Sequence, residues 1–272
     1  RSSFPILEHH GRLQAGADGL PPNGSDDTFG AAVAIHNYVL AVHTPQHDGI
    51  NSIHRGAVRI SSLDADDTVA SYVMRAAETE MSEGGFLAFQ NRSKFGSSLA
   101  WLILDLSGDG HTEMAVGTTE DFARHKYAGE SFGYDCVCTL SLGAGNQLRR
   151  ISRISGGTGG FSGGLVYDST TTFGLCLAAM ADLPGAGVVG LAVGAVTDVY
   201  LHGSDDLVEG TIVVLSLLPN GTVGGVPIRI EMGGMGWHGV VAWGVARGGM
   251  GCGTEWVRWG SSFVSIIQQM LL

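Results

Sequence analysis

The sequence predicts an all-β protein that is rich in turns, and three observations lead to this prediction. Glycine makes up 43 of the 272 residues, and each glycine inside a helix costs about 1 kcal/mol relative to alanine, which disfavours a mostly helical chain. Hydrophobic residues amount to 44%, a content too high for a disordered chain and sufficient for a sizeable core. Short apolar runs alternate with glycine-rich turns, as in proteins made of many short strands.

The charge balance narrows the range of partners. The chain carries 26 Asp and Glu against 15 Lys and Arg, a formal net charge of −11. This charge disfavours binding to nucleic acid or to an anionic membrane surface. No apolar run approaches the roughly 20 residues of a membrane-spanning helix. We therefore expect no nucleic-acid partner and no membrane insertion.

An internal repeat organises the chain as a single domain over residues 1–272. Phe-Gly followed by small and apolar residues occurs at 29–30, 95–96 and 173–174, with a weaker copy at 237–239. A short apolar strand is expected after each copy, at residues 39–42, 114–117, 191–195 and 256–259. An alternating strand should follow at residues 56–60, 136–140 and 210–215. These features define approximate repeats at 15–80, 81–158, 159–224 and 225–272.

Four short strands in about 65 residues is the pattern of a propeller blade. The arrangement resembles the FG-GAP repeats of integrin-alpha-type β-propellers and their bacterial relatives. The resemblance implies about four blades of four antiparallel strands, with calcium in a hairpin loop of some blades. The family usually has seven blades. Either the N-terminal strand, residues 4–13, completes the last blade of a small closed ring, or another chain completes a partial propeller.

One loop has a definite ligand pattern. In Asp105-Leu106-Ser107-Gly108-Asp109-Gly110-His111-Thr112-Glu113, oxygen-bearing side chains occupy positions 1, 3, 5 and 9, with glycine at position 6. Ca²⁺ prefers six to eight oxygen ligands, and glycine permits the sharp turn around the ion. We expect Asp105, Ser107, Asp109 and Glu113 to contribute side chains and His111 its backbone carbonyl. The equivalent loops of the other three repeats lack this pattern. We therefore expect one calcium ion, with a structural role.

A serine hydrolase is the rival interpretation. Gly160-Phe161-Ser162-Gly163-Gly164 fits the G-x-S-x-G nucleophile motif, and His43 and Asp105 precede it in the chain order of trypsin-like proteases. However, Ser162 lies in a recurring Gly-Gly-Phe element, His43 ends a strand of the repeat, and Asp105 is better explained as a calcium ligand. We therefore expect a protein that binds or assembles without catalysis.

Three sequons point to an extracellular setting, secreted or at the cell surface. Asn23, Asn91 and Asn220 are the glycosylation candidates, although Asn-Gly turns alone explain two of them. The expected partners are a protein or glycan ligand, or further copies of the chain.

The four cysteines are too few for a disulfide scaffold. Cys136 and Cys138 should share one face of a strand, with side chains not disposed to pair. Cys176 and Cys252 could pair only if the fold brings them together. The cysteines therefore leave the redox compartment undecided.

Overall fold

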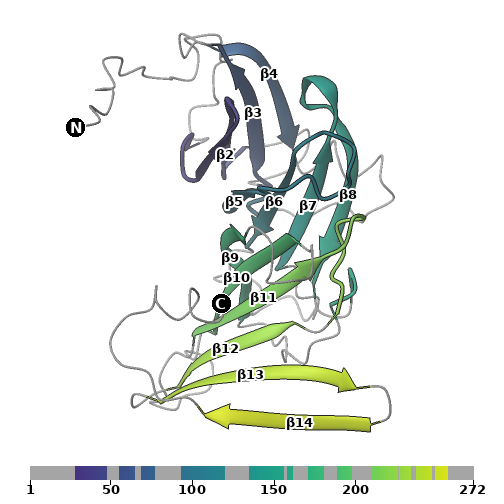
Figure 1. Cartoon of the computed structure of the whole chain (residues 1–272). Coiled ribbons are helices and arrows are strands. Elements are labelled where there is room, and N and C mark those ends of the chain that lie inside the picture. The colour runs from purple at the N-terminus through teal and green to yellow at the C-terminus, as the bar shows by residue number, and fades with distance from the viewer. Residues whose placement is uncertain are drawn as a thin grey trace, which may run out of the picture.

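The computed structural model describes residues 28–47, 55–64, 69–76, 93–119, 135–155, 158–161, 171–180, 189–197, 210–225, 227–233, 237–246 and 249–256. Within these residues it contains fourteen strands and one 3-10 helix, Ala144–Asn146, so the predicted all-β class is confirmed. The strands form three antiparallel sheets (Figure 1). In this part of the chain, no helix has the length and apolar character needed to cross a membrane.

Sheets 1 and 2 have four strands each, and in both every strand pairs with its neighbour in the sequence. Sheet 1 contains β1 (Val33–His36), β2 (Val39–Thr44), β3 (Ala57–Leu63) and β4 (Val69–Ala76). Sheet 2 contains β5 (Ser98–Trp101), β6 (Glu113–Thr118), β7 (Cys136–Leu142) and β8 (Leu148–Ile154). These two sheets fall within the first two sequence repeats, 15–80 and 81–158.

Sheet 3 has six strands, in the order β14-β13-β12-β11-β10-β9. Its strands are β9 (Thr171–Met180), β10 (Val189–Thr197), β11 (Gly210–Leu217), β12 (Ile228–Gly233), β13 (Trp237–Ala246) and β14 (Gly249–Trp256). Only residues 234–236 separate β12 from β13, and Gly233 pairs with Trp237. β12 also pairs with β11 of the third repeat, so the described strands of the fourth repeat continue sheet 3 instead of beginning a fourth sheet.

The strand expected at residues 256–259 meets the described residues only at Trp256, which ends β14, and residues 257–259 lie outside them. β14 pairs with β13, with Gly249 opposite Ala246. The other predicted strands, from residues 39–42 to residues 210–215, all overlap observed strands. The N-terminal strand predicted at residues 4–13 lies outside the described residues.

The three Phe-Gly pairs have a common backbone conformation. Gly30, Gly96 and Gly174 have φ angles of 95°, 103° and 94°, in a region that favours glycine. The Gly30 N–H donates to the carbonyl of His43 at the end of β2, and the Gly96 N–H donates to the carbonyl of Gly117 near the end of β6. In sheets 1 and 2 the glycine of the repeated dipeptide therefore has the same backbone conformation and makes the same type of hydrogen bond to the second strand of the sheet.

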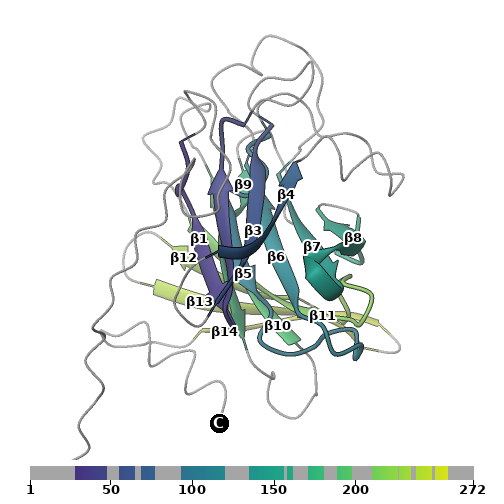
Figure 2. The same cartoon turned by 90° about the horizontal axis from the view of Figure 1, so that it is seen from above.

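Sheet 2 lies between the other two sheets and is buried on both faces (Figures 1 and 2). Alternate side chains of β7 illustrate this arrangement. Cys138 and Leu140 belong to the core shared with sheet 1, whereas Val137 belongs to the core shared with sheet 3. This alternation follows from the two-residue period of a strand.

The first strands of successive sheets lie beside one another. The Trp101 Nε1 on β5 donates to the carbonyl of Ala34 on β1 at 3.1 Å, and the Ser98 hydroxyl on β5 donates to the carbonyl of Gly174 on β9 at 2.6 Å. The described strands thus form a stack of sheets joined along β1, β5 and β9, and they do not close into a ring.

Candidate metal centre

The candidate site is the loop that joins β5 to β6. The two strands are antiparallel neighbours, and the Leu102 N–H donates to the carbonyl of Glu113 across the base of the loop. Gly108 and Gly110 have φ angles of 72° and 80°, in the region that glycine enters at little cost. The two glycines therefore allow the loop to turn tightly enough for its acidic side chains to converge.

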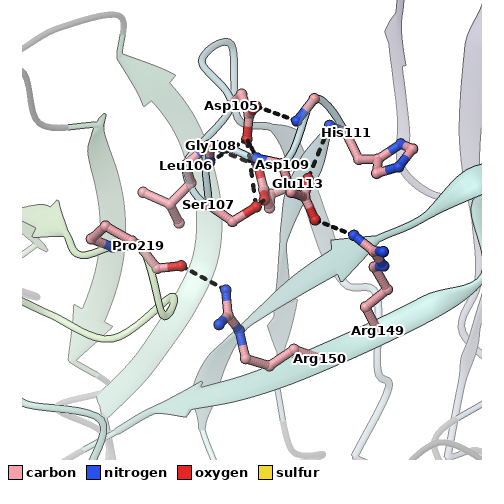
Figure 3. Close-up of polar contacts among 11 residues, drawn as sticks. Asp105, Leu106, Ser107, Gly108, Asp109, His111, Glu113, Arg149, Arg150 and Pro219 are labelled. Atoms are coloured by element: carbon pink, nitrogen blue, oxygen red, sulfur yellow. Dashed lines mark hydrogen bonds and ion pairs between the residues drawn. The ribbon is translucent and has the colours of Figure 1, made fainter.

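Asp105 organises the turn through its carboxylate (Figure 3). Its Oδ1 accepts hydrogen bonds from the N–H groups of Gly108 at 2.7 Å and Asp109 at 3.2 Å, and its Oδ2 accepts one from Gly110 at 2.6 Å. An aspartate that accepts backbone N–H bonds from the residues after it is a common means of fixing a turn. The sequence spacing therefore produces a preformed loop.

Glu113 is the buried member of the site. It is the first residue of β6 and only 1% exposed. Its Oε1 accepts a 2.7 Å hydrogen bond from the Ser107 hydroxyl, and its Oε2 accepts a 2.9 Å bond from the Leu106 N–H. Burying a carboxylate is costly unless it is compensated, so these two bonds hold the side chain facing the loop.

The carboxylates of Asp105, Asp109 and Glu113 form one cluster, with a ligand atom of each within 4.8 Å of the others. Ser107 joins it through Glu113, so the four predicted side-chain ligands are brought together. Among the described residues, the one cation in contact with these carboxylates is Arg149 on β8, which pairs with Asp109 (Figure 3). The cluster therefore has excess negative charge, and its oxygen atoms are of the type that hard divalent cations prefer.

Asp109 differs from the other two carboxylates because it has a cationic partner, Arg149. Desolvation acts to raise its pKa, but the His111 N–H, the Arg149 guanidinium and the Ser107 hydroxyl together hold the pKa below its usual range. The His111 N–H donates to Asp109 Oδ1 at 3.0 Å. The predicted role of the His111 carbonyl stays a prediction. Asp109 is thus available to a cation in its charged form.

Arg149 was missed by the sequence reasoning. It lies 40 positions from Asp109 and reaches the loop only because β8 is the fourth strand of the same sheet. A pairing register for β7 and β8 would have been needed to find it. The local spacing that identified the acidic residues carries no such information.

The described residues do not assemble a hydrolase triad. The Asp105 carboxylate is occupied by N–H groups of its own loop. His43 is 2% exposed, and neither of its ring nitrogens has a hydrogen-bond partner. Ser162 lies outside the described residues. The structure therefore offers no contact between His43 and Asp105.

Of the predicted sequons, only Asn220 falls within the described residues. Its side chain is exposed, and its Oδ1 accepts a hydrogen bond from the Thr222 hydroxyl at 2.7 Å. The backbone of this turn is fixed to sheet 2, because Ser152 donates to the Asn220 carbonyl at 2.6 Å and Thr139 donates to the Gly221 carbonyl at 2.8 Å. Asn23 and Asn91 lie outside the described residues.

The cysteines with described side chains are all free. Cys176 on β9 is exposed, whereas Cys136 and Cys138 on β7 are fully buried. Cys136 and Cys138 share one face of β7, as predicted, and their sulfur atoms are 4.0 Å apart. Cys252 lies on β14, and its side chain is outside the described part of the chain.

Comparisons with protein families and curated proteins do not identify the chain. No protein-family model matches the chain, and no curated protein matches it.

Proposed function

We propose that this chain is a calcium-stabilised β-propeller module of the FG-GAP type that acts by binding or assembly, without catalysis. In this proposal each sheet of the stack is a blade, and β1, β5 and β9 are the inner strands. The shared φ of the Phe-Gly glycines and the contacts between these three strands support the proposal. Propellers are built by such radial repetition of short antiparallel sheets.

The observation that carries the calcium proposal is the convergence of Asp105, Asp109 and Glu113 within 4.8 Å. Three carboxylates at this separation repel one another, and Arg149 compensates only one charge. A divalent cation would relieve the repulsion. Calcium suits the site better than magnesium because it accepts more oxygen ligands in an irregular geometry, whereas magnesium demands a near-ideal octahedron. Its role would be to fix the β5–β6 hairpin.

For the module itself we propose recognition of a protein or glycan ligand through the loops at one end of the stack. Static and dynamic light scattering across a wide concentration range, in calcium and in EGTA, tests this proposal. A recognition module should keep one molar mass at all concentrations in calcium. A mass that grows steadily with concentration would contradict it and would favour a self-assembling subunit.

Self-assembly is the second candidate, and exposed apolar residues on an edge strand favour it. Val33 and Ile35 on β1 are 63% and 64% exposed, and β1 is at the edge of sheet 1. Apolar edge strands invite pairing with another chain. Replacing both residues by threonine should abolish any growth in mass seen by light scattering, while the pair Thr211→Val and Ser216→Val on the interior strand β11 serves as a control.

The extracellular setting is proposed from the calcium loop and from the exposed Asn220 sequon. Expression through a eukaryotic secretory pathway, followed by glycosidase treatment, tests whether Asn220 can carry a glycan. We expect a mobility shift that Asn220→Gln removes or reduces. Asn146→Gln, which alters an asparagine outside any sequon, should leave the shift unchanged. Secreted protein that is insensitive to the glycosidase would contradict the proposal.

A further inference from the structure

A second group of metal-ligating side chains lies in the core between sheets 1 and 2. Cys136 and Cys138 on β7 point to the same face of sheet 2, and both are 0% exposed. Their sulfur atoms are 4.0 Å apart. Neither the candidate metal loop nor the stacking of the sheets requires two thiols at these positions, since two apolar side chains of similar size would fill the same space.

Polar groups accompany this thiol pair. The Thr118 hydroxyl lies 3.2 Å from the Cys136 sulfur, and Arg153 on β8 is directly opposite Cys138 in the pairing of the two strands. Burial acts to raise the pKa of Cys136, but hydrogen bonding from Cys138, the charge of Arg153 and the Thr118 hydroxyl lower it to about 7. The pKa of Cys138 shifts in the opposite direction, because its hydrogen bond with Cys136 and its burial both raise it, so the pair gives up its second proton only to a bound cation.

We propose that Cys136 and Cys138 form a two-coordinate site for a soft monovalent cation, with Cu(I) as its ligand. Thiolate sulfur selects soft ions such as Cu(I). Metal–thiolate bonds are about 2.3 Å long, as they are for zinc, so two sulfurs that share one ion lie at most about 4.6 Å apart. The observed 4.0 Å lies within this limit, and a fully linear S–Cu–S arrangement requires the two sulfurs to separate by about 0.6 Å more. A disulfide would require the sulfurs to approach to about 2.05 Å.

The charge balance of the site is complete. Two thiols and one Cu⁺ give a bis-thiolate complex of charge −1 and release two protons; no atom is oxidised or reduced. A buried anion is costly unless a cation accompanies it. Arg153 supplies that cation from the neighbouring strand, on the same face as the thiols. Among the described residues, no His, Asp, Glu or further Cys lies close enough to the thiol pair to form a group of three metal-ligating side chains, which keeps the coordination at two.

The test titrates the protein with Cu(I), delivered under anaerobic conditions as its bicinchoninate complex, in a background in which Cys176 and Cys252 are serine. We expect one Cu(I) per chain, measured by loss of the bicinchoninate colour and by native mass spectrometry. Cys136→Ser and Cys138→Ser should each reduce this to none. A background protein that takes up no copper at equilibrium, or a Cys136→Ser protein that takes up as much, would overturn the proposal.

Two further measurements keep the result clear if a cysteine variant folds poorly. X-ray absorption at the copper edge of the loaded background protein should show two sulfur ligands and no nitrogen or oxygen ligand; a nitrogen or oxygen ligand would overturn the proposal. Arg153→Gln should weaken binding about tenfold, as removal of an outer-shell partner does. Arg150→Gln, on the same strand but bonded to the Pro219 carbonyl, should leave binding unchanged.

Discussion

A β-carbon placed on Gly96 would lie 2.6 Å from Cδ2 of the His43 ring, closer than two non-bonded carbon atoms can approach. Gly96 belongs to the Phe-Gly turn that leads into sheet 2, and His43 lies on β2 of sheet 1. The same β-carbon would also meet the Val58 side chain at 2.7 Å. The glycine of the repeat is therefore required here both by its backbone conformation and by the close approach of two sheets.

Gly30 and Gly96 form a matched pair for testing this requirement. Both have positive φ, but a β-carbon on Gly30 would have no atom within 4 Å. Gly30→Ala should cost about 1–2 kcal/mol from backbone strain alone. Gly96→Ala should cost about 1–3 kcal/mol more, because the core must also accept an extra methyl group. Urea unfolding of the two variants measures the difference, and equal losses of stability would show that the sheets separate easily at this point.

The buried imidazole of His43 predicts a loss of stability in acid. Burial, assisted by the nearby charge of Lys94, lowers its pKa to about 4 from 6.5. The unfolded chain then binds a proton more readily than the folded chain between these values. Stability from this residue is therefore complete above pH 6.5 and declines as the pH falls to about 4. The total loss is about 3 kcal/mol.

The variant His43→Leu should remove this part of the pH dependence. Its free energy of unfolding, measured by urea denaturation from pH 4 to pH 7.5, should fall less steeply with acid than that of the parent. His36→Gln, at a partly exposed position on β1, is the control and should keep the parent slope. A His43→Leu curve parallel to the parent curve would mean that His43 is already protonated, or accessible to water, in the folded state.

Arg149 should compete with a cation for Asp109. Arg149→Gln removes this ion pair, so the calcium affinity should rise by about two- to fivefold, the equivalent of the 0.4–1 kcal/mol typical of exposed pairs. Isothermal titration calorimetry measures the change. Arg150→Gln removes a neighbouring positive charge that contacts the Pro219 carbonyl instead and should change the affinity less. If calcium binds more weakly to Arg149→Gln, Arg149 holds the loop in shape and does not compete with calcium for Asp109.

The local features of the structure could be predicted from the sequence because their causes are local. The alternate oxygen-bearing residues from Asp105 to Glu113 converge because one short hairpin loop contains all of them. The turn between β1 and β2 has an equally local cause, since only Asn37 and Tyr38 separate the two strands and both have positive φ angles, 45° and 60°.

Features that depend on distant pairing could not be predicted in this way. Arg149 reaches Asp109 through the order of strands in sheet 2, and the continuation of sheet 3 into β13 depends on the short connection between Gly233 and Trp237. The phase of a repeat fixes which residues correspond, but it does not fix which sheet a strand joins.

The central claim is that a calcium ion binds at Glu113 and its neighbouring carboxylates, and thermal unfolding in calcium and in EGTA tests it most directly. At a calcium concentration 100 times the Kd, the folded state should gain about 2.7 kcal/mol, which raises the Tm by about 5–10 °C for a chain of this size. Glu113→Gln keeps the shape of the side chain but replaces one acceptor oxygen by an NH2 group and removes the buried charge, so it should lose most of this rise; Asp64→Asn, outside the loop, should keep it. A Tm that is the same in calcium and in EGTA, or an equal rise in Glu113→Gln, would contradict the account.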